Sequence, residues 1–121
     1  MITAEVYKEK SVLGACSMAL CIPDEKLHAT RLSMAAQMLR SSSIGSVLDV
    51  GCGFCDLVDH LGEAKTYAGI EVTDWIRQKA KEDRPHLQLF AGEALRVLRA
   101  MTGSRYDAVV ALGVLSTCLP D

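Results

Sequence analysis

Two acidic residues lie at the ends of short apolar runs, where a folded sheet would present them to a ligand. Asp49 stands shortly before a loop with glycines at positions 51 and 53, and Glu71 ends the apolar run 66–71. Glycines between a strand and a helix permit a tight turn and a close approach of the backbone to a bound group. This arrangement predicts a small-molecule site built from the glycine loop and the two carboxylates.

The position of Asp49 discriminates between possible ligands. In a dinucleotide site the same loop receives a pyrophosphate, which a nearby carboxylate would repel. A ligand with an ammonium group would instead give Asp49 a charge-assisted hydrogen bond. Glu71, at the end of the next strand, could accept hydrogen bonds from both hydroxyls of a ribose. Together the two acids favour an adenosine ligand that also carries a cationic group.

Structural roles are the alternative for these acids. Asp49 could cap the amides of the turn that follows it, and Glu71 and Glu93 could be acids that begin the next helix. We expect Glu71 to end its strand at the ligand crevice rather than in the core. Its replacement by alanine would then leave the fold intact.

The elements that must position these residues alternate along the chain. Helical patterns come first, at 3–19 and 23–40, and from residue 46 strand-like runs alternate with helical segments. The strands are expected at 47–50, 66–71, 87–90 and 106–112, and the helices at 55–61, 74–82 and 93–100. Such alternation is typical of βαβ units that build a parallel sheet with helices on both faces. We therefore predict one α/β domain over residues 1–121, with two N-terminal helices in 1–45 and a βα core in 46–121.

The motifs of this core resemble those of class I S-adenosylmethionine-dependent methyltransferases. Residues 47–55 are similar to the first motif of that family, an apolar strand with an acid followed by G-x-G-x-G, with Cys55 in place of the third glycine. Residues 89–94 are similar to the third motif, in which the acid position, here Glu93, meets the adenine amino group. Residues 106–115 are similar to the fourth. The resemblance covers about residues 46–115.

The resemblance implies a Rossmann-like sheet with strand order 3-2-1-4 and S-adenosylmethionine as the cofactor, with S-adenosylhomocysteine as its product. It implies a methyltransferase, or its cofactor-binding portion, and a non-catalytic module for assembly or regulation is the alternative. The family's later strands, which build most of the substrate side, are expected to be missing, and no catalytic residue is assigned. The expected cofactor contacts are Asp49, Gly51, Cys52, Gly53, Glu71, Val72, Gly92, Glu93, Ala94 and Ala111.

The cysteines suggest reduced thiols rather than disulfides or a metal. Their number, five, is odd, and no secretory signal pattern precedes them, so we predict a cytoplasmic protein. The pairs Cys16/Cys21 and Cys52/Cys55 could supply four thiolates to zinc, but the second pair falls inside the glycine loop, and we predict no metal. A redox pair at Cys52 and Cys55 would require a thioredoxin-like context, which the acid and glycines around it do not match.

Charge and hydropathy narrow the possible partners. Thirteen Lys and Arg residues against 15 Asp and Glu residues give a net charge of −2, which argues against nucleic acid. The longest apolar stretch is too short for a membrane span, so we expect a small-molecule substrate and no membrane. The apolar run 106–115 would form a sheet edge without Lys or Pro to block strand addition. A homodimer or a partner chain is therefore expected to cover it.

Overall fold

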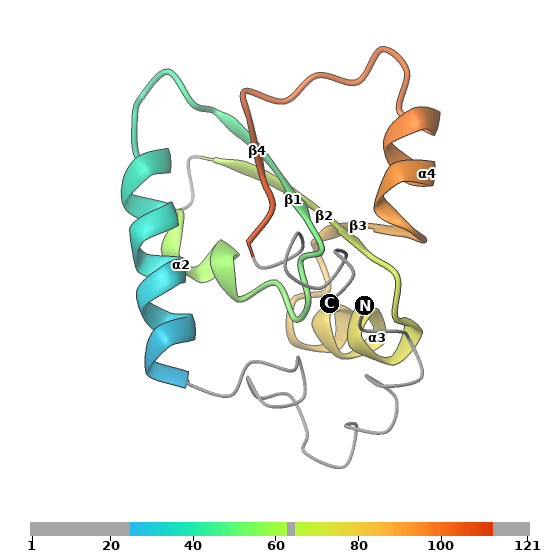
Figure 1. The fold of residues 1–121 in the computed structure, drawn as a ribbon, viewed down its shortest axis with the longest axis horizontal. Coiled ribbons are helices and arrows are strands. Elements are labelled where there is room, and N and C mark those ends of the chain that lie inside the picture. The colour runs from blue at the N-terminus through green and yellow to red at the C-terminus, as the bar shows by residue number, and fades with distance from the viewer. Residues whose placement is uncertain (1–24, 63–64, 113–121) are drawn as a thin grey trace, which may run out of the picture.

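A four-stranded parallel sheet forms the centre of the protein (Figure 1). The computed structural model describes residues 25–62 and 65–112. The strands are β1 (Ser46–Val50), β2 (Thr66–Glu71), β3 (Gln88–Ala91) and β4 (Ala108–Val110), in the order β3-β2-β1-β4. The helices are α2 (Glu25–Leu39), the 3-10 helix η3 (Asp56–His60), α3 (Asp74–Asp83) and α4 (Ala94–Ala100). The predicted Rossmann-like α/β fold and strand order are confirmed.

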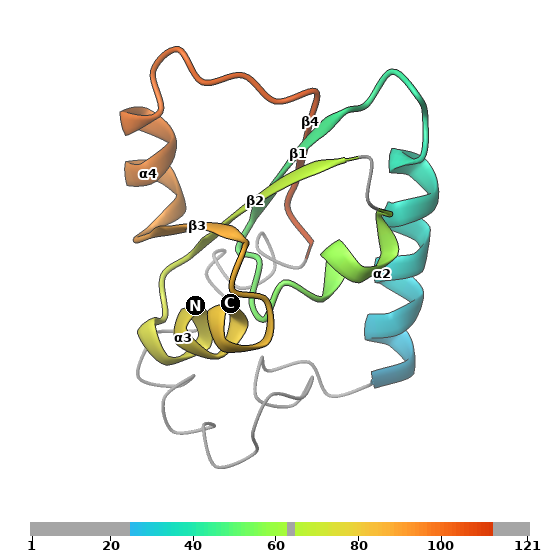
Figure 2. The same cartoon turned by 180° about the vertical axis from the view of Figure 1, so that it is seen from behind.

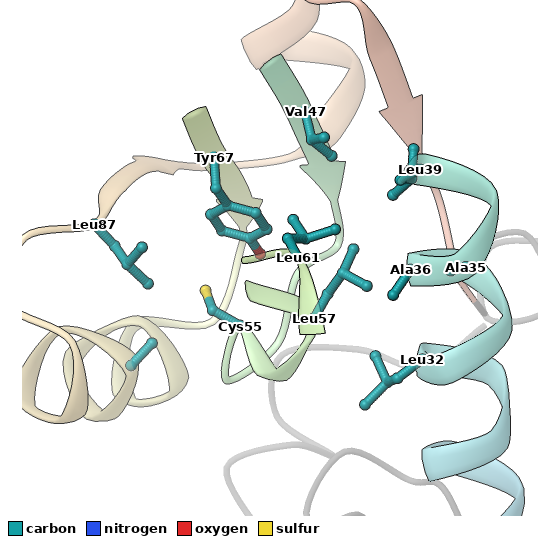
Figure 3. Close-up of a cluster of buried hydrophobic side chains, with 11 residues drawn as sticks. Leu32, Ala35, Ala36, Leu39, Val47, Cys55, Leu57, Leu61, Tyr67 and Leu87 are labelled. Carbon is teal, nitrogen blue, oxygen red and sulfur yellow. The ribbon is translucent and has the colours of Figure 1, made fainter. Parts of the chain in front are cut away.

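Helices cover both faces of this sheet, as predicted. On one face α2, η3 and α3 pack on β1 and β2, because α2 directs one stripe of residues inward at i, i+3, i+4 and i+7 (Figure 3). These residues are Leu32, Ala35, Ala36 and Leu39. On the other face Val97 of α4 packs against the alternate residues of β1 and β2, and the two views show α4 on the opposite side from α2 (Figure 2). The helix predicted at 3–19 lies outside the described residues.

The helical segment after the glycine loop is shorter than predicted. An α-helix was expected at 55–61, whereas the structure has the single 3-10 helix η3, which begins at Asp56. Cys55 has a φ of 66°, in the left-handed region, and this residue therefore cannot belong to a right-handed helix. The loop thus continues one residue farther than the sequence pattern indicated.

The fourth strand is also shorter than the predicted span 106–112. Asp107 lies before β4 and bonds to the start of β1, where its Oδ2 accepts the N–H groups of Gly45 at 2.7 Å and Ser46 at 3.1 Å. The N–H of Asp107 donates in turn to the hydroxyl of Ser46. These bonds hold Asp107 outside the strand ladder, so regular pairing with β1 covers only Ala108–Val110.

None of the described helices is both long enough and apolar enough to cross a membrane.

Candidate functional site

The predicted cofactor residues gather at the carboxyl ends of the four strands. Asp49 lies in register with Gly69 of β2 and Val110 of β4, and Glu71 lies in register with Ala91 of β3. Parallel strands end at the same edge of a sheet, where open α/β proteins bind their ligands. The topology therefore brings the ends of all four strands, which are distant in sequence, to one edge.

Every second residue of the glycine loop, residues 51–55, has a left-handed backbone conformation. Gly51, Gly53 and Cys55 have φ angles of 69°, 58° and 66°. The left-handed region costs a residue with a Cβ about 1–2 kcal/mol, and glycine avoids this cost. The structure thus explains why a third glycine suits position 55, and it shows that cysteine there keeps the same turn.

Hydrogen bonds fold this loop onto β2. The N–H groups of Gly51 and Cys52 both donate to the carbonyl of Ile70, at 2.9 Å and 3.0 Å. The N–H of Cys55 donates to the carbonyl of Cys52 at 3.0 Å. Since these amides bond to main-chain carbonyls, Asp49 is not the cap of the turn amides, and that structural alternative is wrong.

Glu71 connects the glycine loop to α3. Its Oε1 accepts the N–H of Gly53 at 3.1 Å, and its Oε2 accepts the N–H of Thr73, the residue before α3, at 2.9 Å. The residue is 7% exposed. The expectation that Glu71 stands outside the core is therefore wrong, and its role at the start of α3 is observed. A carboxylate oxygen can accept two hydrogen bonds, and each oxygen of Glu71 accepts one from the main chain. Each oxygen could therefore accept a further bond from a ribose hydroxyl.

Asp49 is buried with a single hydrogen-bond donor. It is 4% exposed, and its Oδ2 accepts the hydroxyl of Tyr67 at 2.6 Å. Burial raises the pKa of Asp49 to about 7; the bond from Tyr67 opposes this shift, and the negative charges of Glu71 and Asp56 add to it. A cation placed beside Asp49 would favour its charged form. The site is thus suited to a positively charged group on a ligand.

Tyr67 was not predicted as a site residue. It lies in register with Val47, two residues before Asp49 on the same face of the sheet, so its long side chain reaches the carboxylate. Burial and the charge of Asp49 raise the pKa of the Tyr67 hydroxyl, which stays a donor. The alternation of the two strands would have identified this pair if their register had been known.

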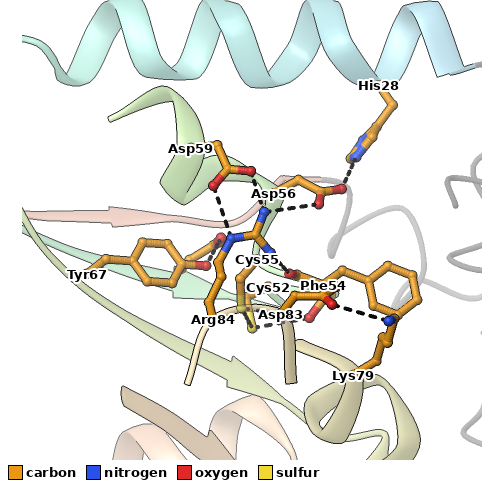
Figure 4. Close-up of polar contacts among 12 residues, drawn as sticks. His28, Cys52, Phe54, Cys55, Asp56, Asp59, Tyr67, Lys79, Asp83 and Arg84 are labelled. Atoms are coloured by element: carbon orange, nitrogen blue, oxygen red, sulfur yellow. Dashed lines mark hydrogen bonds and ion pairs between the residues drawn. The ribbon is translucent and has the colours of Figure 1, made fainter. Parts of the chain in front are cut away.

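Arg84, the residue after α3, forms hydrogen bonds with the glycine loop and with η3 (Figure 4). Its Nη1 donates to the carbonyl of Phe54 at 3.0 Å, and its Nε donates to Asp59 of η3 at 3.0 Å. The pair with Asp59 raises the pKa of Arg84 and lowers that of Asp59. His28 of α2 bonds to Asp56 at 3.3 Å, which joins α2 to the same network. No local sequence signal marks Arg84, because its partners come from distant segments.

The two thiols of the glycine loop lie against each other. Cys52 Sγ and Cys55 Sγ are 3.4 Å apart. The contact between the two thiols lowers the pKa of Cys55, whereas the same contact and burial raise the pKa of Cys52. Within residues 25–62 and 65–112 no three His, Cys, Asp or Glu side chains form a group that could hold a metal. Cys16 and Cys21, which the zinc alternative requires, lie outside the described residues.

An open pocket of about 490 Å³ lies beside Glu71, at the ends of β2 and β3. It contains three predicted residues, Val72, Gly92 and Glu93. The other lining residues are Asp74, Arg77, Ala91 and Arg96. Glu93 precedes α4 but makes no side-chain capping bond, so a helix-capping role for its carboxylate is not observed.

The other two predicted residues, Ala94 and Ala111, do not line this pocket. Ala94 begins α4, directly after Glu93, and it packs partly against the cluster under that helix. Ala111 follows β4 and is exposed. The strand pairing puts Ala111 at the same sheet edge as Asp49, but it does not line the pocket.

Solved structures share this fold, although no family profile and no curated protein matches the sequence. The amino pentose methyltransferase CalS10 from Micromonospora echinaspora, bound to S-adenosylmethionine, aligns with a TM-score of 0.60 and 23% identity over 76% of this chain and 39% of that chain. The methyltransferase domain of bacterial CtHen1-CN aligns with a TM-score of 0.62 and 24% identity over 78% and 54% of the two chains. An O-methyltransferase from Bacillus cereus, in complex with S-adenosylhomocysteine, aligns with a TM-score of 0.62 and 11% identity over 92% of this chain and 55% of that chain.

The chain therefore has the fold of class I S-adenosylmethionine-dependent methyltransferases, as its motifs indicated. It spans 39%, 54% and 55% of the lengths of these three structures.

Proposed function

We propose that this chain binds S-adenosylmethionine and forms the cofactor-binding part of a methyltransferase. The observation that carries the proposal is the pair of buried carboxylates, Asp49 and Glu71, on either side of the glycine loop in a methyltransferase fold. Two of the similar solved structures contain S-adenosylmethionine or S-adenosylhomocysteine.

Each part of the cofactor has a chemically matched group in this proposal. Glu71 accepts the ribose hydroxyls, and the pocket beside Val72 and Glu93 receives the adenine. Asp49 faces the positive charge of the methionine part, and this charge would favour the ionised form of the buried carboxyl group. The proposed contacts remain those predicted from the sequence, namely Asp49, Gly51, Cys52, Gly53, Glu71, Val72, Gly92, Glu93, Ala94 and Ala111.

Methyl transfer makes few demands on side chains. The sulfonium is already electrophilic, and the acceleration comes mainly from holding a nucleophile in line with the methyl carbon at about 3 Å. A small molecule is the proposed acceptor, because the chain has a net charge of −2 and no basic run that would attract nucleic acid. The acceptor side would come from segments beyond those that build the cofactor site.

Urea unfolding with and without S-adenosylhomocysteine tests the proposal directly. Saturating ligand, at about a hundredfold excess over Kd, should raise the free energy of unfolding by about 2–3 kcal/mol. NAD serves as the control, because its pyrophosphate would meet the carboxylate of Asp49. Equal stabilisation by both ligands, or by neither, would contradict the proposed site.

A non-catalytic module is the second candidate, and the cysteine at position 55, where the family's first motif has its third glycine, favours it. The chain would then bind the cofactor without transferring its methyl group. A screen with S-adenosylmethionine and small molecules bearing hydroxyl, amine and thiol groups separates the two functions. Production of S-adenosylhomocysteine with any acceptor supports the enzyme, and cofactor binding without turnover supports the module.

We also propose that a second copy of the chain pairs along β4. This strand is an edge of the described sheet, and Val109, at its centre, is 62% exposed. Val109 lies in register with Leu48, so it projects from the face that α4 covers farther along the sheet. Free strand edges with apolar side chains readily accept another strand.

The cytoplasmic location stays a prediction from the cysteine content.

A further inference from the structure

The thiols of Cys52 and Cys55 lie close together in the glycine loop. Their sulfur atoms are 3.4 Å apart, and a main-chain hydrogen bond of 3.0 Å from Cys55 to Cys52 closes the turn between them. Residues joined by such a turn have Cα atoms within 7 Å. A disulfide needs Cα atoms about 4.4–6.8 Å apart and an S–S bond of about 2.05 Å. The two thiols are therefore a short movement away from bonding distance.

The sheet beneath the loop leaves room for this pair. Gly69 of β2 lies directly under Cys52, and a Cβ at position 69 would stand 2.6 Å from the Cys52 sulfur. Any other residue at this position would displace the thiol. Cys52 is partly exposed and Cys55 is buried, so a reagent in solution reaches Cys52 first.

The residues around Cys52 and Cys55 predicted no redox pair, but the two sulfurs lie 3.4 Å apart. From this geometry we propose that Cys52 and Cys55 form a reversible disulfide that distorts the glycine loop and weakens cofactor binding. The disulfide itself depends only on the geometry of the thiols, whereas its effect on the cofactor rests on the function proposed above.

A small-molecule disulfide such as oxidised glutathione is the oxidant. Cys52 passes its proton to the neighbouring Cys55 thiolate, and the Cys52 thiolate then attacks one sulfur of glutathione disulfide, forming a Cys52–glutathione bond and releasing one glutathione thiolate. Cys55 loses its proton to solvent and attacks the Cys52 sulfur, which forms the protein disulfide and releases the second glutathione. Two protein thiols are oxidised, and one glutathione disulfide is reduced to two thiols.

The residues between the cysteines would carry this change to the site. Gly53 donates its N–H to Glu71, and Phe54 packs edge to face on Trp75 with ring centroids 5.7 Å apart. We expect the bond between the two sulfurs to pull on this turn and to shift both intervening residues, because the turn contains only these two. Oxidation should therefore disturb the bond to Glu71 and change the surroundings of Trp75, the only tryptophan in the chain.

The first experiment detects the disulfide without using a cofactor. Cys16, Cys21 and Cys118 are replaced by serine, which leaves Cys52 and Cys55 as the only thiols. After incubation with oxidised glutathione, intact mass should show the loss of two hydrogens, and Trp75 fluorescence should change in parallel. Dithiothreitol should reverse both. Two alkylatable thiols after oxidation, or a glutathione adduct that never resolves, would overturn the proposal.

The second experiment measures S-adenosylhomocysteine binding before and after oxidation. Oxidation should raise the Kd at least about tenfold, and reduction should restore it. The double variant Cys52→Ser, Cys55→Gly is the matched control, because glycine accepts the φ of 66° and the variant offers oxidised glutathione neither thiol of the loop. Its Kd should not respond to oxidised glutathione. An unchanged Kd in the fully oxidised protein would overturn the effect on the loop, and a disulfide in a protein that never binds the ligand would overturn the proposed function instead.

Discussion

The carboxyl ends of β1 and β2 hold their polar groups very differently from those of β3 and β4. At the first pair of strands, Asp49 and Glu71 are buried, and hydrogen bonds tie the glycine loop to β2, α3 and η3. At the second pair, Glu93 and Ala111 are exposed, and β4 pairs with β1 over three residues. The first half of the site is thus organised before a ligand binds, and the second half is open.

The comparison also separates the two buried acids. Glu71 accepts two main-chain N–H groups, which compensate for its burial, whereas Asp49 accepts one hydroxyl and sits near two other carboxylates. Burial without compensation is costly for a charge. The buried charge of Asp49 therefore destabilises the fold, which fits a carboxylate whose function is to bind a ligand.

The largest expected effect is that of Asp49→Asn on stability at alkaline pH. Because the pKa of Asp49 rises from 3.8 to about 7 on folding, the folded protein binds a proton that the unfolded chain releases. The free energy of unfolding should therefore fall as pH rises from about 4 to about 7 and stay level above that. Removing the charge should stabilise the protein by about 4 kcal/mol at pH 8. Urea unfolding of both proteins at several pH values measures this.

The pH dependence makes this prediction specific. The stability gain of Asp49→Asn should grow by about 2–3 kcal/mol between pH 5 and pH 8. Asp74→Asn is the control, because the side chain of Asp74 is 93% exposed. Its effect should be small and independent of pH. A constant difference between wild type and Asp49→Asn over the whole range would show that Asp49 is charged throughout.

The next effect is that of Glu71→Ala, which removes the acceptor of two buried N–H groups. We expect a loss of about 2–4 kcal/mol in the free energy of unfolding, since each unsatisfied group costs about 1–3 kcal/mol. Binding of S-adenosylhomocysteine should weaken by about 1.5–3 kcal/mol as well. Glu93→Ala is the control from the open half of the site, and its stability should change by no more than about 0.5 kcal/mol. Equal losses in the two variants would remove the distinction between the halves.

A charge on the edge strand β4 should weaken assembly into a dimer and leave the stability of the fold unchanged. Val109→Lys puts an ammonium group on the exposed centre of β4, so it should weaken the proposed dimer by about tenfold or more and leave the urea midpoint nearly unchanged. Met38→Lys, on α2, is the control, because Met38 is an apolar side chain that is 79% exposed and lies outside β4. Sedimentation measures both variants. A wild-type protein that stays monomeric at high concentration would refute pairing along β4.

The smallest effect concerns the backbone at position 55. Glycine normally destabilises a protein relative to alanine, but the φ of 66° at Cys55 reverses this preference. Cys55→Gly should therefore be more stable than Cys55→Ala by about 1 kcal/mol. Both variants lose the same thiol, so thermal unfolding of the pair isolates the backbone contribution. The opposite order would mean that the loop relaxes out of its left-handed conformation.

Local patterns in the sequence determined the elements and their order. The apolar run that ends at Glu71 matches β2 from Thr66 to Glu71, and the stripe from Leu32 to Leu39 identified α2, because periodicity reports which face is buried. The alternation of strands and helices led to the parallel sheet, and the acid and glycines at 49–53 led to its ligand-binding edge. These are properties of short segments, and a single sequence contains them in full.

Only the tertiary structure decided which hydrogen bonds the acids accept and where two elements, η3 and β4, begin. The contacts of Asp49 with Tyr67, of Glu71 with Gly53, and of Arg84 with Phe54 join segments whose register and approach no local pattern specifies. The late start of η3 after Cys55 and the late start of β4 after Asp107 occur where distant residues bond to these segments, Arg84 to Phe54 and Asp107 to Gly45. Hydrogen bonds between remote residues are set by the packing of the whole sheet, and for that reason the sequence predicted the location of the site but not its internal bonding.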